Sequence, residues 1–162
     1  MTKIEKALKY ARAQLSRVSP YVWGGQGEKV TKMTVTKLAA MEDTPRNAGR
    51  VMEFIKRNIK GITSKSKCFD CSGFVICCLI YAGILKKGYD DTANGLMHTF
   101  NPISRAARKA GDLVFKVDKN GKAYHVGILL DPDNVAESRG RDYGVVKTPF
   151  NDDWQEIRRP LL

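Results

Sequence analysis

One stretch near the middle of the chain, Phe69 to Ile80, constrains the fold more than any other. It opens with Asp70 and Ser72, residues that favour a helix start, and continues into an apolar segment long enough for three helical turns. The pattern therefore predicts a buried helix with Cys71 at or near its N-terminus. Free N–H groups and the helix dipole stabilise a thiolate there, so we expect the pKa of Cys71 to lie below the usual value of about 8.5.

The part of the chain before this stretch is predicted to form a helix, an aromatic loop and an insertion. Apolar residues recur at helical spacing over residues 3–17, and Pro20 ends that helix. Residues 21–27 are aromatic and then glycine-rich, which is typical of an extended segment followed by a turn. Residues 28–67 are mixed and polar, with a predicted helix at 48–59. We expect an insertion here, forming a lid or a binding surface, or else a plain surface helix.

After the central helix the sequence period changes from helical to alternating. Gly83 is a helix stop, and residues 90–108 predict a loop with a short helix that carries His98. Strands are predicted at residues 111–117, 123–130, 135–138 and 145–148. Helices followed by an antiparallel meander indicate the α+β class. The length fits a single domain over residues 1–162.

Composition narrows the classes of partner. The net charge is +11, from 28 Lys and Arg against 17 Asp and Glu, which favours anionic partners such as nucleic acid, anionic wall polymers or acidic membranes. The basic residues are spread along the chain without a nucleic-acid-binding motif, so we expect no nucleic-acid partner. No apolar run approaches the roughly 18 residues of a membrane span, so we expect no membrane-spanning segment.

The four cysteines are too clustered to staple distant parts of the chain, and we expect reduced thiols. Cys68 and Cys71 form a C-x-x-C, but a thioredoxin-like redox fold places a strand directly before that motif, whereas polar residues 63–67 precede it here. Cys77 and Cys78 lie inside the apolar run with no second ligand pair, which argues for core thiols rather than zinc. Neither a metal nor a cofactor is expected.

A nucleophilic cysteine needs a base, and the base needs a group that orients its ring. Of the two histidines, His125 lies on a predicted strand, where a sheet could hold its ring, whereas His98 lies in the loop region. The turn at residues 131–134 would bring the next strand back beside His125, with Glu137 on it. From the pattern alone, an orienting carboxylate and an ordinary surface carboxylate are equally good interpretations of Glu137.

Four blocks of the sequence carry a resemblance to a known family. They are Tyr21-Val22-Trp23-Gly24-Gly25, Asp70-Cys71-Ser72-Gly73-Phe74-Val75, Gly111-Asp112-Leu113-Val114-Phe115 and His125-Val126-Gly127-Ile128. In this order they resemble the hallmark blocks of the NlpC/P60 family of papain-like cysteine peptidases. The resemblance implies that fold, with the nucleophile helix packed on an antiparallel meander.

The resemblance also implies a reaction and its residues. Cys71 would be the nucleophile, His125 the general base and acid, and Glu137 the third catalytic residue. The substrate would be a peptidoglycan stem peptide, typically cut at the γ-D-glutamyl to diamino acid bond through an acyl-enzyme. The family more often has His, Asn or Gln at the third position, so Glu137 departs from the common pattern.

Four further residues match family positions that line the substrate pocket: Tyr21, Trp23, Asp70 and Ser72. The resemblance suggests that Asp70 reads the free amine of an L-alanine, while its sequence position equally fits a helix cap. Forty-seven residues separate Trp23 from Cys71, more than is usual in the family, which affects the expected pocket shape.

Two other functions stay open. The same thiol chemistry would serve an N-acetylmuramoyl-L-alanine amidase, and the fold could also serve a wall-binding or assembly protein without catalysis. In each case the expected site of action is the bacterial cell wall, in an extracellular or periplasmic location. The first ten residues lack the apolar core of a secretion signal, which favours a phage lysin or an injected enzyme.

Overall fold

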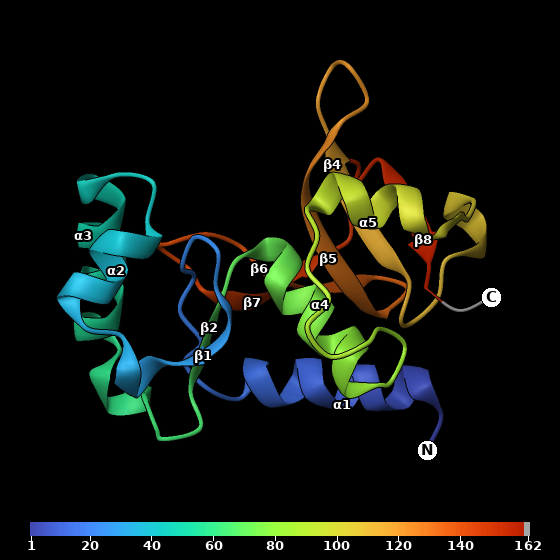
Figure 1. Ribbon diagram of the computed structural model, residues 1–162. Coiled ribbons are helices and arrows are strands. Elements are labelled where there is room, and N and C mark those ends of the chain that lie inside the picture. The colour runs from blue at the N-terminus through green and yellow to red at the C-terminus, as the bar shows by residue number, and fades with distance from the viewer. Residues whose placement is uncertain (161–162) are drawn as a thin grey trace.

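The computed structural model describes residues 1–160, in which five α-helices and eight strands are formed (Figure 1). The helices are α1 (Lys3–Leu15), α2 (Val35–Met41), α3 (Pro45–Arg57), α4 (Cys71–Tyr81) and α5 (Ala93–Thr99). The strands are β1 (Gln26–Lys29), β2 (Lys67–Phe69), β3 (Asn101–Pro102), β4 (Leu113–Val117), β5 (Ala123–Asp131), β6 (Asn134–Ser138), β7 (Val145–Pro149) and β8 (Glu156–Arg159). No helix in residues 1–160 is long and apolar enough to cross a membrane.

Six strands form one antiparallel sheet in the order β3-β8-β4-β5-β6-β7. The run from β4 to β7 is the expected meander, so the predicted α+β class is confirmed. Strand β8 was not predicted: it pairs with β4 on the outer side of the meander, with Leu113 opposite Arg158. Its four residues include a single buried apolar side chain, Ile157, which is too little for a recognisable alternation.

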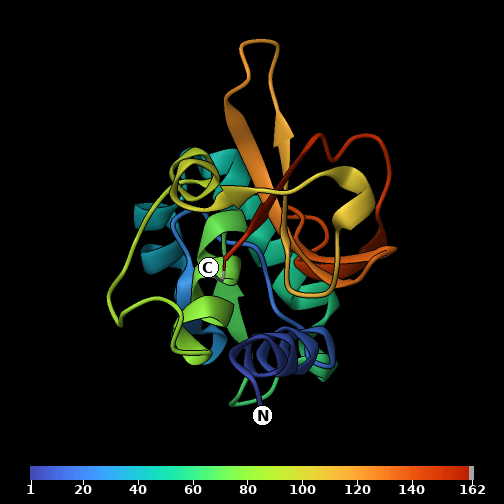
Figure 2. The same cartoon turned by 90° about the vertical axis from the view of Figure 1, so that its right-hand side faces the viewer.

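Helix α4 is the central element of the fold. Its side chains are apolar on every face, as expected of a helix that is covered on all sides. It packs between α1 and strand β5, and the view along α1 shows α4 lying above it (Figure 2). The residues that it buries are Ser72, Gly73, Phe74, Val75, Ile76, Cys78 and Leu79. Because the core closes around this helix, the position of its first residue, Cys71, is fixed.

The start of α4 is held by a close contact with the glycine loop before β1. Asp70 caps the helix by accepting a hydrogen bond from Gly73 N at 2.6 Å, and its other oxygen accepts one from Gly24 N at 3.1 Å. The carbonyl of Gly25 accepts from Asp70 N at 2.9 Å. A Cβ at Gly73 would lie 2.0 Å from that carbonyl oxygen, so only glycine fits at this point of the helix. The loop and the helix start are therefore one interlocked unit.

The short strand β2 runs directly into this unit. Residues 63–66 form no strand, and β2 begins only at Lys67, so it contains Cys68 and Phe69 of the C-x-x-C and does not precede the motif. The argument against a thioredoxin-like redox fold therefore holds. Strand β2 pairs with β1 in a separate two-stranded sheet, outside the six-stranded sheet.

The segment at residues 28–67 carries α2 and α3, which lie to one side of the molecule, away from the main sheet (Figure 1). Helix α3 begins at Pro45, earlier than the predicted 48–59, and α2 was not predicted. The two helices pack around a second apolar cluster made of Val22, Val30, Met33, Leu38, Val51 and Cys68. Since that cluster includes residues on both sides of the segment, α2 and α3 are packed onto the domain.

The close contact at Gly73 predicts a large asymmetry between two Gly→Ala substitutions in helices. Gly73→Ala should lower the free energy of unfolding by at least about 2 kcal/mol, because a backbone oxygen occupies the space. Gly49→Ala in α3, which meets no atom within 4 Å, should raise it by roughly 0.5–1 kcal/mol. Urea denaturation of both variants measures this, and equal effects would contradict the contact.

Candidate active site

Cys71 opens onto a cavity of about 670 Å³ at the N-terminal end of α4. The walls come from the glycine loop, the start of α4, the α4–α5 connection and the β4–β5 hairpin. They are lined by Tyr21, Trp23, Gly24, Gln26, Asp70, Cys71, Ser72, Asp90, Asp91, Thr92, Ala93, Asp118, Lys122, Ala123 and Tyr124. All four residues expected to bind substrate are among them. A hydrogen bond from Gln26 Nε2 to Asp90 Oδ1 joins two of the walls.

The environment of the Cys71 thiol differs from the expectation. Burial, followed by the negative charge of Asp70, raises the pKa of Cys71 to about 11. Backbone N–H groups of Ser72 and Val126 act in the opposite direction without overcoming it. The predicted lowering of the pKa was wrong, because the helix terminus is enclosed and a carboxylate stands next to the sulfur. At neutral pH the free protein carries a thiol, which needs a base during any reaction.

The structure brings His125 and Glu137 together on neighbouring strands. Strands β5 and β6 are antiparallel, and Nε2 of His125 lies 3.1 Å from Oε1 of Glu137. The second carboxylate oxygen of Glu137 accepts from the Thr148 hydroxyl at 2.5 Å. Burial acts to raise the pKa of Glu137, but the hydrogen bonds from His125 and Thr148 outweigh it and hold the pKa below its ordinary value. Glu137 is therefore an ionised, 2% exposed carboxylate that orients the imidazole.

Trp154 also holds the His125 ring, and sequence reasoning missed it. The two rings stack with centroids 5.5 Å apart and an interplanar angle of 28°, and Trp154 is 1% exposed. On the indole, the Lys116 ammonium lies 4.8 Å from the ring centroid. A tryptophan twenty-nine residues beyond the histidine carries no local signal for this contact.

The Cys71 thiol lies against β5, the strand that carries His125. The N–H of Val126, the residue after His125, faces the Cys71 sulfur. Because Nε2 of His125 is engaged with Glu137, Nδ1 is the ring atom that can serve the thiol. Within residues 1–160 the structure has no hydrogen bond between that sulfur and the ring. His98 is exposed in the last turn of α5, and neither His98 nor His125 is among the residues that line the cavity.

The cavity wall formed by Tyr21 and Trp23 is braced from behind by the 28–67 segment. Glu42, at the end of α2, has a fully buried carboxylate that accepts from Trp23 N at 2.9 Å and binds the Arg141 guanidinium at 2.6 Å. The guanidinium also lies 5.3 Å from the ring centroid of Tyr21 and 5.8 Å from that of Trp23. This segment therefore supports the pocket wall. That role is neither the lid or binding surface nor the plain surface helix that the sequence suggested.

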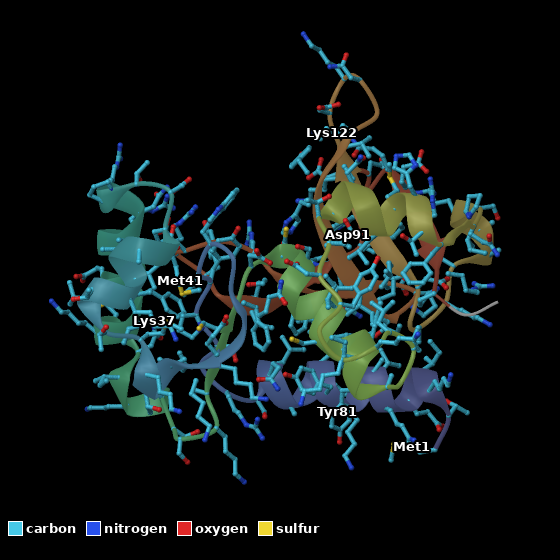
Figure 3. All side chains as sticks on the ribbon, viewed as in Figure 1. Met1, Lys37, Met41, Tyr81, Asp91 and Lys122 are labelled. Atoms are coloured by element: carbon cyan, nitrogen blue, oxygen red, sulfur yellow. The ribbon has the colours of Figure 1, made fainter. Side chains whose placement is uncertain are left out.

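The charge of the cavity wall is opposite to that of the whole chain. Four carboxylates line the cavity, on Asp70, Asp90, Asp91 and Asp118, against one ammonium, on Lys122. Asp91 and Lys122 lie on the α4–α5 connection and the hairpin that flank it (Figure 3). Asp70 also has a structural role, since its two carboxylate oxygens accept hydrogen bonds from Gly73 N and Gly24 N. The wall favours a ligand that carries positive charge.

Comparison with known proteins identifies the family of this chain. A sequence model of the NlpC/P60 family matches residues 18–158. The chain belongs to the NlpC/P60 family. The predicted resemblance is therefore confirmed. No curated protein matches the chain.

Solved NlpC/P60 structures share the fold of this family member. The P60 domain of an antigen from M. avium subspecies paratuberculosis has a TM-score of 0.64 at 20% identity, covering 99% of this chain and 96% of that one. The peptidoglycan hydrolase RipB from Mycobacterium tuberculosis has a TM-score of 0.66 at 20% identity, with 99% of this chain matched to 65% of RipB. RipD from the same organism, described as a non-catalytic NlpC/p60 domain protein, has a TM-score of 0.64 at 18% identity, covering 99% of each chain.

The remaining cysteines of this NlpC/P60 domain are unpaired thiols. Cys78 is buried in the core, the Cys68 thiol donates to the Glu28 carbonyl at 3.2 Å, and the Cys77 sulfur lies 3.4 Å from the Gln26 carbonyl oxygen. The part of the chain that the structure describes has no group of three His, Cys, Asp or Glu side chains placed to hold a metal ion.

The effect of Asp70 on the thiol predicts the result of a single charge removal. In Asp70→Asn the side-chain oxygen can still accept from Gly73 N and cap the helix, while the hydrogen bond from Gly24 N is lost together with the charge that adds to burial in raising the pKa of Cys71. Alkylation of Cys71 by iodoacetamide at pH 8, followed by peptide mass analysis, should therefore be faster in Asp70→Asn than in the parent. Asp91→Asn, at a cavity carboxylate with no part in that pKa shift, should leave the rate unchanged. Equal rates in Asp70→Asn and the parent would contradict the assignment.

The buried brace predicts a second difference between matched variants. Glu42→Gln should lower the free energy of unfolding by about 2–4 kcal/mol, because Arg141, whose side chain is 13% exposed, loses its main partner. Arg50→Gln removes an ion pair to Asp142 in the same loop, but that pair is 42% and 49% exposed and should cost less than about 1 kcal/mol. Chemical denaturation measures the free energy of unfolding of both variants. A similar loss in Glu42→Gln and Arg50→Gln would show that Glu42 does not support the wall.

Proposed function

We propose that this protein is a cysteine peptidase that cleaves peptidoglycan stem peptides at the bond between a γ-D-glutamyl residue and a diamino acid. The observation that carries the proposal is the thiol of Cys71 at the wall of an open cavity, beside the strand that holds His125 and its Glu137 partner. Membership of the NlpC/P60 family supports it, as does the likeness of the fold to that of RipB, a peptidoglycan hydrolase.

The first half of the reaction begins with a neutral thiol. As the Cys71 sulfur adds to the scissile carbonyl carbon, its proton passes to Nδ1 of His125. The ionised Glu137 accepts from Nε2–H and stabilises the imidazolium that forms. N–H groups at the start of α4 donate to the oxyanion. Collapse of the adduct breaks the C–N bond, and His125 gives its proton to the leaving amine.

The second half releases the acyl group. Water gives a proton to His125 while its oxygen attacks the thioester carbon, and the C–S bond breaks as the sulfur takes the proton back. The free acid and the original thiol result, so no cofactor or metal enters the balance.

The cavity also suggests how the stem peptide is held. In a stem peptide already detached from the glycan, the L-alanine end carries a free ammonium, which Asp70 and the Ser72 hydroxyl beside it would stabilise. Such an ammonium would offset the charge that raises the pKa of Cys71, so binding would favour proton loss from the thiol. Tyr21 and Trp23, with their rings on the braced wall, would pack against the peptide. The site of action would be the bacterial cell wall.

A second candidate is peptidoglycan binding without catalysis. Two observations favour it: the raised pKa of Cys71, and the existence of RipD, a non-catalytic protein of the same fold.

Digestion of purified peptidoglycan decides among the candidates. We expect the parent protein to release peptides and leave L-Ala-γ-D-Glu on the glycan, as seen by mass analysis. Cys71→Ala should lose this activity by at least about a thousandfold, because the nucleophile is gone. The matched thiol variant Cys77→Ala should keep it. Bare lactyl groups on the glycan would identify an amidase, and retained lysis by Cys71→Ala, or sedimentation with peptidoglycan without any release, would overturn the peptidase proposal.

A further inference from the structure

A second, smaller cavity of about 260 Å³ lies at the opposite end of α4 from Cys71. It is lined by Lys9, Tyr10, Ala13, Gln14, Arg17, Lys67 and Tyr81. Tyr81 is the last residue of α4, which at 11 residues is about 16 Å long. Figure 3 shows Tyr81 beside α1, with Asp91 and Lys122 of the large cavity beyond the other end of the helix. The two cavities are therefore separate.

The charge of this cavity is uncompensated. Three cationic side chains line it, on Lys9, Arg17 and Lys67, and no carboxylate does. Within residues 1–160 none of the three forms an ion pair, whereas Arg50, Arg105, Arg108, Arg141, Arg158 and Arg159 all do. The Lys67 ammonium is placed by Tyr10, 3.5 Å from the phenol oxygen and 5.5 Å from the ring centroid. Unpaired like charges around a hollow attract an anion.

A buried amide points to a ligand independently of the charge. Gln14 is 1% exposed, and its Oε1 atom is buried without a hydrogen-bond partner. A buried polar atom in that state costs free energy until a donor reaches it. Gln14 lines the same cavity, so a ligand hydroxyl could donate to Oε1 while the amide N–H groups donate to an anionic oxygen.

We propose that this cavity binds a phosphate ester with a neighbouring hydroxyl, the repeating unit of polyol-phosphate chains. The phosphate oxygens match the three cations, and the hydroxyl matches the one orphaned acceptor. The cavity has room for one phosphate and the adjoining polyol. Because it lies at the far end of α4, an occupied site leaves the Cys71 cavity open, and the inference does not depend on the proposed peptidase activity.

Calorimetric titration of the full chain with glycerol 3-phosphate and inorganic phosphate tests the proposal. Glycerol 3-phosphate should bind more tightly, because it alone supplies an alcohol hydroxyl on the carbon chain beside the phosphate. The double substitution Lys67→Gln with Arg17→Gln should weaken binding by at least about tenfold, since two charged donors are lost. Lys65→Gln, an exposed lysine outside the cavity, should change it by less than about twofold. Gln14→Leu should weaken glycerol 3-phosphate more than inorganic phosphate.

Two arms identify the source of the unit. Soluble poly(glycerol phosphate) and vesicles of phosphatidylglycerol carry the same group. The natural source is the probe that the parent protein binds and the Lys67→Gln, Arg17→Gln double variant binds more weakly. In the parent protein, glycerol 3-phosphate should also slow acylation of Lys67 but not of Lys65, a readout that needs no variant. Failure of glycerol 3-phosphate to bind, an equal loss in Lys65→Gln, or binding only to an oligonucleotide would overturn the proposal.

Discussion

The structure depends on one carboxylate, that of Asp70, and on the two glycines that it draws together. It caps α4 through Gly73, holds Gly24 of the preceding loop, and so allows the carbonyl of Gly25 to approach where no side chain could fit. This contact puts the first residue of the core helix at the edge of an open cavity. The same negative charge adds to burial in raising the pKa of the Cys71 thiol, so the group that builds the site also opposes ionisation of that thiol.

That conflict explains why the sequence predicted the position of the thiol and not its ionisation. A polar cluster before an apolar run locates a helix terminus by local rules, and Cys71 is the first residue of α4. Ionisation depends on how deeply the sulfur is enclosed, which tertiary packing sets. The charge of Asp70 is adjacent in the sequence, and its effect on the pKa could have been foreseen.

The same division between local and distant causes runs through the fold. Alternating strands, the turns between them and the pairing that brings His125 near Glu137 follow from period and turn residues close in sequence. Strand β8, the stacking of Trp154 on His125 and the contact of Glu42 with Arg141 join residues far apart. Nothing local in the chain marks those partners, because each gains its role only when the sheet and the 28–67 segment are assembled.

The position of the 28–67 segment has a consequence for how such a domain can diversify. This segment holds the aromatic wall through Glu42 and contributes none of the side chains that line the Cys71 cavity. Substitutions within α2 and α3 can therefore tilt or widen that wall while the thiol, the imidazole and its carboxylate partner stay as they are. The support of the aromatic wall and the side chains beside the Cys71 sulfur are thus encoded in different stretches of the gene, so the wall can change in shape while those side chains are kept.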